Sequence, residues 1–382
     1  MINIDDKSKC TGCTACANAC PKQCIKMVQD ELGFSYPAID PSSCNNCGLC
    51  EKICPVMNKK DSQDSYPEKA FAVRCKDLNI RMDSSSGGVF SLLGQKIFEE
   101  YGIVFGASLN ESHHVDHIAA SSSDDLISLR GSKIIQSSIG YSYQNAKRYL
   151  DDGKKVLFTG TPCQIYGLFR YLGKRYDNLI TQDIICHGVC SPALYDKYIS
   201  YNKEKHNCDI RSIKFRDKAT GWRDYSVSIC YENGEKTVIQ HAKDELMRAY
   251  LRNYALRPSC YNCCFKGNNR ASDITLADFW GAEHFVSDLD DDKGISFVIC
   301  HSESGEKFLK SVLSETDYKE VNYSDVIKYN MSGEVSSPQP ADNDRFCKDL
   351  FIVPFHSLVE TYCKISLVSK FKRFIKKLLK KH

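Results

Sequence analysis

The sequence of 382 residues contains no apolar run that approaches the length of a membrane-spanning helix. Its N-terminus, Met-Ile-Asn-Ile-Asp-Asp, has neither the basic start nor the apolar stretch of a secretory leader. It has no strong excess of one charge either: the net charge is +3, and residues 364–382 alone carry +8, which leaves −5 for the rest. These absences predict a cytoplasmic protein and speak against nucleic-acid binding.

Cysteine, in contrast, is abundant, with 21 residues, and in a reducing compartment thiolates serve as metal ligands rather than in disulfides. Two near-identical runs of four lie within the first 55 residues, and each ends in Cys-Pro. Three thiolates at x2 spacing hold one [4Fe–4S] cubane, and the fourth, beyond a turn, reaches the other. We expect one cluster on Cys10, Cys13, Cys16 and Cys54, and a second on Cys44, Cys47, Cys50 and Cys20. Zinc sites or a disulfide framework are the alternatives, but neither needs a repeated triplet followed by Cys-Pro.

The body after these runs alternates helix-like and strand-like segments. Helical spacing predicts helices over 89–101 and 164–172. Short apolar runs predict strands over 103–107, 155–159, 179–185, 213–215, 225–231 and 237–241, with a turn at Asn233-Gly234. The predicted fold class is α+β: a small two-cluster ferredoxin domain followed by a mixed α/β body.

Five motifs in the body carry a resemblance to a known family. They are Ser84-Ser-Ser-Gly-Gly-Val-Phe90, Leu129-Arg-Gly-Ser-Lys133, Gly160-Thr-Pro-Cys-Gln164, Asp183-Ile-Ile-Cys-His-Gly-Val189, and Cys260-Tyr-Asn-Cys-Cys264 followed by Asp278-Phe-Trp-Gly281. In this order they resemble the coenzyme F420 hydrogenase/dehydrogenase beta-subunit family over nearly the whole chain. The resemblance implies an oxidoreductase with iron–sulfur clusters and FAD, which exchanges electrons with a hydride-accepting partner. Bacterial members with a fused ferredoxin often accompany polysaccharide-biosynthesis genes.

Two segments are candidates for binding the flavin. Ser86, Gly87 and Gly88 precede a predicted helix, where backbone N–H groups and the helix dipole favour an anion such as a pyrophosphate. A plain helix N-cap by a serine would explain the same residues. Lys133 is a candidate for pairing a phosphate or lying near the flavin ring, and a solvated surface lysine is its alternative. Ile134 stands where relatives usually carry an aromatic residue, which weakens a stacking role.

Four further cysteines are candidates for a third [4Fe–4S] cluster, which the resemblance also implies: Cys163, Cys186, Cys260 and Cys263. Cys163 lies where a strand passes into a helix, whose N-terminus is expected to lower its thiol pKa. Cys186 ends another strand of the same sheet, and Cys260 and Cys263 form a chelating pair. Ordinary buried thiols and a zinc site are the alternatives. Cys190 or Cys264 could replace a ligand. The remaining cysteines fit no ligand pattern and are expected to pack: Cys24, Cys75, Cys208, Cys230, Cys300, Cys347 and Cys363.

The catalytic residue stays unassigned. His187 is a candidate proton donor, although a structural histidine is the commoner case. The expected divisions are the ferredoxin domain at 1–57, a linker at 58–67, a flavin-binding part at 68–150, a part with the third cluster and the flavin or substrate site at 151–335, and an extension at 336–382.

The predicted function is electron transfer between ferredoxin-type clusters and a two-electron acceptor through FAD. The partner is a redox protein or a small hydride acceptor, and the sequence does not name it. The alternative is a non-catalytic electron-transfer subunit of a larger redox complex. A third, weaker hypothesis is a zinc-bearing structural protein.

The C-terminal tail combines apolar residues at helical spacing, such as Phe371, Phe374 and Leu378, with lysines and an arginine between them. This pattern predicts a basic amphipathic helix. Such a helix lies on an anionic membrane surface at the inner face of the membrane, or docks on the body or on a partner.

Sedimentation with anionic vesicles distinguishes these two uses of the tail. Each basic residue near such a surface contributes about 1 kcal/mol, so the full chain should sediment with the vesicles at low salt and be released at high salt. A chain ending at Ser366 is the control and should stay in the supernatant. If the full chain also stays there at low salt, the membrane hypothesis is wrong.

Overall fold

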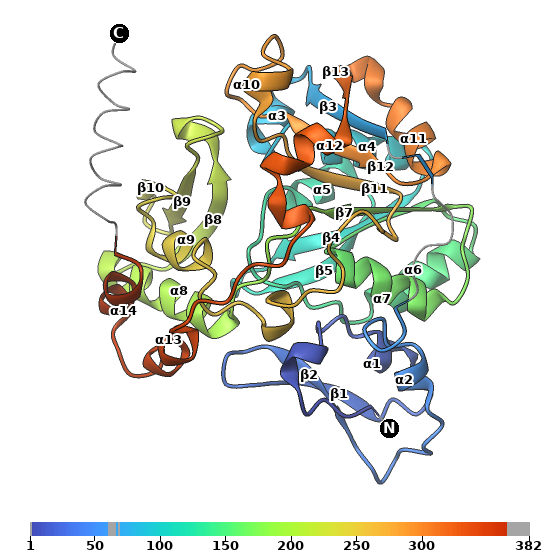
Figure 1. Ribbon diagram of the computed structural model, residues 1–382, viewed down its shortest axis with the longest axis vertical. Coiled ribbons are helices and arrows are strands. Elements are labelled where there is room, and N and C mark those ends of the chain that lie inside the picture. The colour runs from blue at the N-terminus through green and yellow to red at the C-terminus, as the bar shows by residue number, and fades with distance from the viewer. Residues whose placement is uncertain (1, 60–65, 68, 365–382) are drawn as a thin grey trace.

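A computed structural model describes residues 2–59, 66–67 and 69–364 of the chain (Figure 1). Most of the predicted linker and of the basic tail therefore lies outside the described residues, and both stay predictions. Within the described part, none of the helices combines the length and the apolarity that crossing a bilayer requires.

The N-terminal region, residues 2–59, contains one hairpin and two short helices (Figure 1). The strands β1 (Ile25–Gln29) and β2 (Ser35–Ile39) pair antiparallel, with Ile25 opposite Ile39. The helices are α1 (Ala15–Ala19) and α2 (Leu49–Lys52). A 3₁₀ turn, η1 (Lys7–Lys9), comes first.

The two cysteine runs repeat each other in backbone conformation as well as in sequence. Gly12 and Asn46 occupy equivalent positions, and both have positive φ, at 66° and 55°. Two residues further on, Thr14 and Gly48 do the same, at 61° and 72°. Each left-handed pair turns the chain into a short helix that carries the third cysteine of its run. The repeated spacing therefore corresponds to a repeated loop conformation.

The body is built on an eight-stranded mixed sheet, which confirms the predicted fold class. The strand order is β13-β3-β12-β11-β7-β6-β4-β5. Four central strands, β4, β6, β7 and β11, run parallel, and the others pair antiparallel. The bounds are β3 (Lys69–Cys75), β4 (Ile103–Leu109), β5 (Val115–Ala120), β6 (Val156–Thr159), β7 (Leu179–Ile184), β11 (Ile274–Asp278), β12 (Ser296–Cys300) and β13 (Thr316–Val321).

Helices cover both faces of this sheet (Figure 1). On one face, α4 (Val89–Glu99), α5 (Ser123–Leu129) and α11 (Glu303–Lys310) bury a core that includes Leu93 and Phe308. On the other face lie α6 (Ser142–Asp151) and α7 (Pro162–Leu172). The predicted helices over 89–101 and 164–172 are thus confirmed as α4 and α7, since their apolar stripes face the sheet.

A three-stranded sheet stands beside the body with the order β10-β9-β8. It comprises β8 (Ile210–Asp217), β9 (Ser226–Tyr231) and β10 (Lys236–Gln240), and Gly234 turns the predicted hairpin at φ +87°. Its core is shared with α8 (Pro192–His206), α9 (Glu245–Tyr250), α13 (Asn343–Asp349) and α14 (Phe355–Tyr362). The remaining short helices are α3 (Leu78–Asp83), α10 (Ala282–Phe285) and α12 (Tyr323–Val326), with 3₁₀ turns η2 (Lys218–Thr220), η3 (Pro258–Cys260), η4 (Leu313–Glu315), η5 (Ile327–Tyr329) and η6 (Met331–Gly333).

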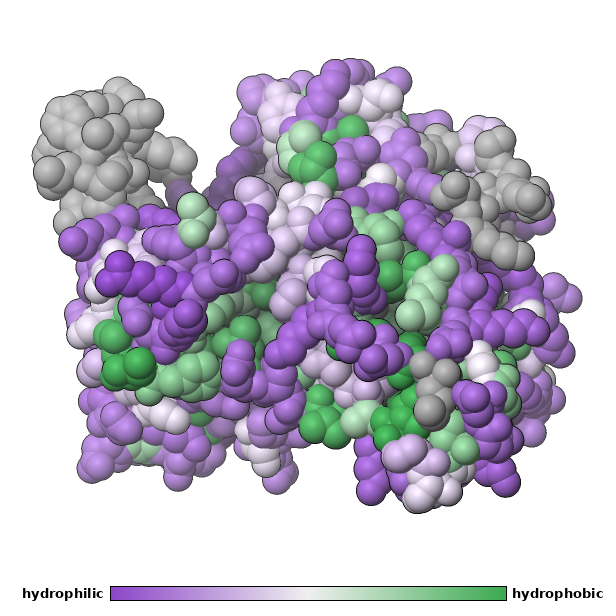
Figure 2. Space-filling view, turned by 60° about the horizontal axis from the view of Figure 1, so that its bottom comes forward, coloured by the Kyte–Doolittle hydropathy of each residue, from purple (hydrophilic) through white to green (hydrophobic). Residues whose placement is uncertain are grey.

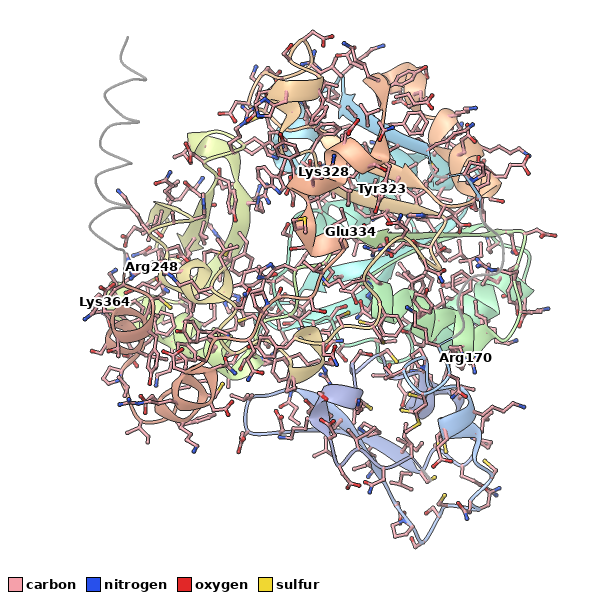
Figure 3. All side chains as sticks on the ribbon, in the orientation of Figure 1. Arg170, Arg248, Tyr323, Lys328, Glu334 and Lys364 are labelled. Carbon is pink, nitrogen blue, oxygen red and sulfur yellow. The ribbon has the colours of Figure 1, made fainter. Side chains whose placement is uncertain are left out.

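The N-terminal region packs against α6 and α7 of the body. Cys13, Ala15 and Ile53 belong to the same buried core as these two helices. Arg170 of α7 donates a hydrogen bond to the carbonyl oxygen of Lys52 at this contact (Figure 3). With this end of the molecule turned forward, the surface is mostly hydrophilic and its hydrophobic patches are scattered (Figure 2). The contact places the first cysteine run directly beneath α7.

Candidate metal centres

The first quartet, Cys10, Cys13, Cys16 and Cys54, comes together in the N-terminal region. The charges of Cys10 and Cys54 both act on the thiols of Cys13 and Cys16. Burial is the larger effect and raises the pKa of Cys13 to about 12. Cys54, the last cysteine of the second run, therefore lies with the first run, as the spacing predicts.

The second quartet, Cys20, Cys44, Cys47 and Cys50, lines a hollow of about 330 Å³ at the outer end of the region. Here the last cysteine of the first run joins the second run. Cys50 also accepts a hydrogen bond at Sγ from the backbone N–H of Ile2, at 3.3 Å. Amide donors to thiolate sulfur are the environment that iron–sulfur clusters use to set their potentials. The donor set fits a [4Fe–4S] group.

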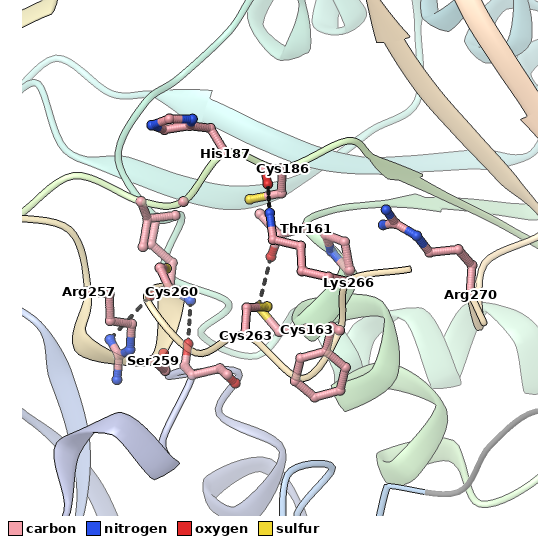
Figure 4. A pocket seen from close by; sticks show the side chains of 16 residues that line it. Thr161, Cys163, Cys186, His187, Arg257, Ser259, Cys260, Cys263, Lys266 and Arg270 are labelled. Carbon is pink, nitrogen blue, oxygen red and sulfur yellow. Dashed lines mark hydrogen bonds between the residues drawn. The ribbon is translucent and has the colours of Figure 1, made fainter. Parts of the chain in front are cut away.

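The third quartet, Cys163, Cys186, Cys260 and Cys263, lines a single hollow of about 480 Å³ in the body (Figure 4). The four thiols come from three separate segments: the start of α7, the end of β7, and the chain at and after η3. The charges of Cys186 and Cys263 act on both Cys163 and Cys260. The strand ends thus converge as expected.

Three cations line this hollow with the thiols: Arg257, Lys266 and Arg270. Lys266 donates from Nζ to the carbonyl oxygen of Cys186, and its charge lowers the pKa of that thiol against the stronger effect of burial. No carboxylate of the described residues lines the hollow. Four thiols beside three cations, of which Arg270 is paired with the buried Asp183, are a donor set chemically suited to an anionic metal–thiolate centre. Among the described residues, no group of three or more His, Cys, Asp or Glu side chains is placed to hold a metal ion.

Cys163 corrects one expectation from the sequence. Thr161 caps α7 and forms a capping box with Gln164, and the thiol of Cys163 lies 3.2 Å from the Thr161 hydroxyl. Burial nevertheless raises the pKa of Cys163 well above its ordinary value. The expected lowering of this pKa by the helix N-terminus is therefore outweighed by the effect of burial. A metal at this site must displace protons from the thiols that it binds.

Cys190 and Cys264, the two possible substitute ligands, lie outside the hollow of the third quartet. Cys190 is completely buried in the core around α8, where its thiol contacts the carbonyl oxygen of Ser191 at 3.6 Å. Cys264 is exposed, and its carbonyl oxygen accepts a hydrogen bond from Lys59 at 2.6 Å. Neither thiol lines the hollow of the third quartet.

His187 lines the same hollow as the third quartet. Its ring packs edge-on against Tyr250 at 5.0 Å, and burial lowers its pKa below the ordinary value. A neutral imidazole is therefore the favoured form at neutral pH. Its role as a proton donor stays a prediction.

The glycine-rich segment before α4 is held by its neighbours. The Ser86 hydroxyl donates to the carbonyl oxygen of Ile295 at 2.7 Å, and the Gly87 N–H donates to the Ser296 hydroxyl at 3.0 Å. A Cβ on Gly87 would lie 2.6 Å from the Ser296 nitrogen, and Gly88 has φ +89°. Close packing on β3 and β12 thus accounts for Gly87, and the left-handed backbone conformation accounts for Gly88.

The second flavin candidate lies beside the first. The hydroxyls of Ser85 and Ser132 are 3.0 Å apart, so the loop of Lys133 runs next to the segment before α4. Lys133 donates from Nζ to the carbonyl oxygens of Ser128 and Arg130, at 3.1 and 2.6 Å. Its burial lowers the amine pKa to about 7. The structure brings the two segments together, and their flavin-binding role stays a prediction.

Arg257 is a site residue that the sequence reasoning missed. Its side chain is 1% exposed, and Nε donates to the carbonyl oxygen of Cys10 at 2.9 Å. Nη2 donates to the Ser35 carbonyl oxygen at 2.9 Å and contacts the Cys10 sulfur at 3.8 Å. The guanidinium lies 4.5 Å from the centre of the Tyr36 ring. The only signal in the sequence was one arginine between the apolar Leu256 and Pro258.

The charge of Arg257 has no carboxylate partner at ion-pair distance in residues 2–59, 66–67 and 69–364. It borders the third quartet on one side (Figure 4). On the other side it touches Cys10 of the first quartet. A buried cation needs a compensating negative charge nearby. The two quartets supply it when they hold anionic metal–thiolate centres.

Two segments of the chain match known protein families. Residues 9–58 match the 4Fe–4S dicluster domain, and residues 153–326 match the family described as the C terminus of the beta subunit of coenzyme F420 hydrogenase/dehydrogenase. The chain thus has a region similar to a 4Fe–4S dicluster domain and a second region similar to the C-terminal part of this beta-subunit family, which confirms the resemblance seen in the motifs. The second match begins after the predicted flavin-binding part at 68–150.

A solved chain from the F420-reducing [NiFe] hydrogenase complex of Methanosarcina barkeri is also similar. It has 15% sequence identity and a TM-score of 0.46, and the match covers 81% of this chain and 97% of that chain. No curated protein matches the sequence.

Replacing Arg257 with methionine should loosen the contact between the N-terminal region and the body. Each buried carbonyl left without its donor costs about 1–3 kcal/mol, while methionine keeps the apolar contact with Tyr36. Hydrogen exchange, measured by mass spectrometry on the full chain, should become faster over residues 24–40. Arg252→Met, a change at an exposed arginine nearby, is the matched control and should leave this exchange unchanged. Equal protection in Arg257→Met and the unaltered chain would show that Arg257 does not hold the contact.

Proposed function

We propose that this protein is an iron–sulfur flavoprotein oxidoreductase that transfers electrons between three [4Fe–4S] clusters and a two-electron acceptor through FAD. The observation that carries the proposal is the adjacency of the first and third quartets. A Cβ on Gly167 of α7 would lie 3.3 Å from the Cys13 sulfur, and α7 begins at the segment that bears Cys163. The charge of Cys13 also acts on the Cys163 thiol.

The three quartets would hold the clusters in the order second, first, third, from the outer end of the N-terminal region into the body. The second and first quartets exchange their last cysteines, and the first and third share α7 and Arg257 as neighbours. A bound [4Fe–4S] cluster supplies one-electron transfer at each position. The protein residues supply the thiolates, the surrounding cations and the exclusion of water. This arrangement supports a continuous route between the dicluster domain and the body.

The FAD part of the proposal rests on the family similarity and on the adjacency of the two candidate loops. Two amines lie near this place, the half-buried Lys133 and the buried Lys218, and loss of solvation lowers the pKa of each to about 7. Lys218 donates from Nζ to the carbonyl oxygen of Ser86 at 2.6 Å. A bound pyrophosphate would favour the charged form of such amines. The acceptor would be a redox protein or a small hydride acceptor.

Metal analysis of the anaerobically purified chain tests the third quartet. The unaltered protein should hold about twelve iron, since each cubane has about four. Cys186→Ala should lose about four of them, because a missing thiolate destabilises its cluster. Cys190→Ala removes a buried thiol four residues away and should keep all the iron. About eight iron in the unaltered chain, or zinc in place of the missing iron, would remove the third cluster from the proposal.

Flavin binding is tested separately on the same chain. One FAD per chain should be released on denaturation and detected by its fluorescence, and a diffusible two-electron acceptor should be reduced by the chain alone. Lys133→Gln should weaken FAD binding about tenfold, equivalent to about 1.4 kcal/mol of lost charge–phosphate interaction, with unchanged iron content. The control is Lys155→Gln, at a surface lysine paired with Glu100. Absence of flavin and of turnover, with all clusters present, would favour the alternative of a non-catalytic electron-transfer subunit.

A further inference from the structure

Lys266 is a half-buried cation beside the thiols of the third quartet. It follows Cys263 by three residues and lines the hollow that the four thiols share. Within residues 2–59, 66–67 and 69–364, no carboxylate lies at ion-pair distance from its ammonium group. The sequence pattern predicts no role for Lys266, because this residue stands outside the cysteine spacing.

The other two cations of the hollow differ from Lys266. Arg270 is paired, because Nη1 lies 3.2 Å from a carboxylate oxygen of Asp183 and both residues are buried. The two opposite charges largely cancel at a distance. Arg257 is shared between quartets, because it also contacts the Cys10 sulfur at 3.8 Å. Among the described residues, Lys266 is thus the unpaired cation that borders the third quartet without touching the first.

Three segments of the body hold the ammonium group in place. Nζ donates to the carbonyl oxygen of Cys186, just after β7, and the side chain extends toward that residue in Figure 4. Nζ also donates to the carbonyl oxygen of Ser332 in η6, at 2.6 Å. The neighbouring Gly267 N–H donates to the carbonyl oxygen of Gly333 at 2.8 Å, so η6 and the segment of Lys266 are joined twice. The charge is therefore fixed beside the quartet.

This charge acts on the hollow against the effect of burial. Burial raises the pKa of Cys186, while Lys266 lowers it and Arg270 lowers it to a smaller extent. A positive charge favours any group in the hollow that becomes more negative. A [4Fe–4S] cluster gains one negative charge on reduction, and nearby charge is one of the factors that set its potential. Removal from water has the opposite effect, because it disfavours the more highly charged form.

The surroundings of the second quartet show why such a cation matters in the body. In the described part of the chain, no charged side chain lines the hollow of the second quartet, and Cys47 there is exposed. Water can stabilise a reduced cluster at that place. In the third quartet, burial raises the pKa of Cys163, Cys186 and Cys260, so solvation is weaker. A fixed protein charge has to replace the missing solvation.

We propose that Lys266 raises the reduction potential of the third cluster and so keeps this buried cluster reducible by the first. The inference rests on the proposed function, which places a cluster in each quartet. In the transfer, one electron leaves the first cluster, which is oxidised, and reaches the third, which is reduced. No bond forms or breaks, and no proton is transferred.

A redox titration of the full chain, purified without oxygen and followed by EPR, tests this role. Lys266→Gln removes the charge and keeps a donor for the carbonyl oxygens. At the potential where the third cluster of the unaltered chain is half reduced, its reduced-to-oxidised ratio should be about tenfold lower in this variant, equivalent to about 59 mV for one electron. The signal of the third cluster is the one that Cys186→Ala lacks. The iron content and the potentials of the other two clusters should stay unchanged.

Two further variants separate the charge of Lys266 from its structural role. Lys266→Arg keeps the positive charge and should restore most of the ratio. Lys59→Gln is the matched control, because Lys59 donates to the carbonyl oxygen of Cys264 at 2.6 Å but does not line the hollow. This control should leave the potential of the third cluster unchanged.

An unchanged potential in Lys266→Gln would overturn the inference, as would equal shifts in Lys266→Gln and Lys266→Arg. Equal shifts of all three clusters would contradict it too. Loss of the third cluster from a folded Lys266→Gln chain would show that Lys266 holds the site together, and would likewise overturn the inference. If Lys266→Gln does not fold, Lys266→Met is titrated in its place with the same expected result. Absence of the third cluster from the unaltered chain would instead refute the proposed function.

Discussion

The structure depends most on one buried cation, the guanidinium of Arg257. It joins the two parts of the molecule, because its donors reach Cys10 and Ser35 in the N-terminal region while its backbone belongs to the segment that leads to Cys260. Burying a charge without a partner is unfavourable by several kcal/mol. The carbonyl oxygens and the Tyr36 ring offset part of this, and the anionic centres proposed on both sides would offset more. Docking of the two parts and assembly of the proposed centres would therefore be coupled.

Helix α7 brings the first and third quartets close together at this contact. Its first turn carries Cys163, and Gly167, one turn further on, faces Cys13 across the contact. A side chain at Gly167 would meet the Tyr143 hydroxyl at 2.7 Å and the Cys13 Cβ at 3.1 Å. The glycine lets the N-terminal region approach closely, and a close approach is what one-electron transfer between separate centres needs. The same short helix thus positions one thiol of the third quartet and brings that quartet close to the first.

The features that the sequence predicted are those that local spacing controls. The repeated cysteine runs fold into repeated loops because left-handed residues stand at the same two places in each. The convergence of Cys163 and Cys186 followed from strand ends that share one edge of a sheet. The features that the sequence did not predict depend on partners far away in the chain. Arg257 meets Cys10 across 247 positions, and the Gly87 N–H meets Ser296 across 209. The raised pKa of Cys163 depends on burial, which spacing alone does not reveal.

Anomalous X-ray scattering from a crystal grown without oxygen tests the central claim most directly. Data collected on either side of the iron absorption edge locate iron independently of the protein phases. We predict three iron centres per chain: two in the N-terminal region, and one surrounded by Cys163, Cys186, Cys260 and Cys263 next to Arg257. Iron confined to the N-terminal region, with zinc or no metal among these four thiols, would contradict the claim.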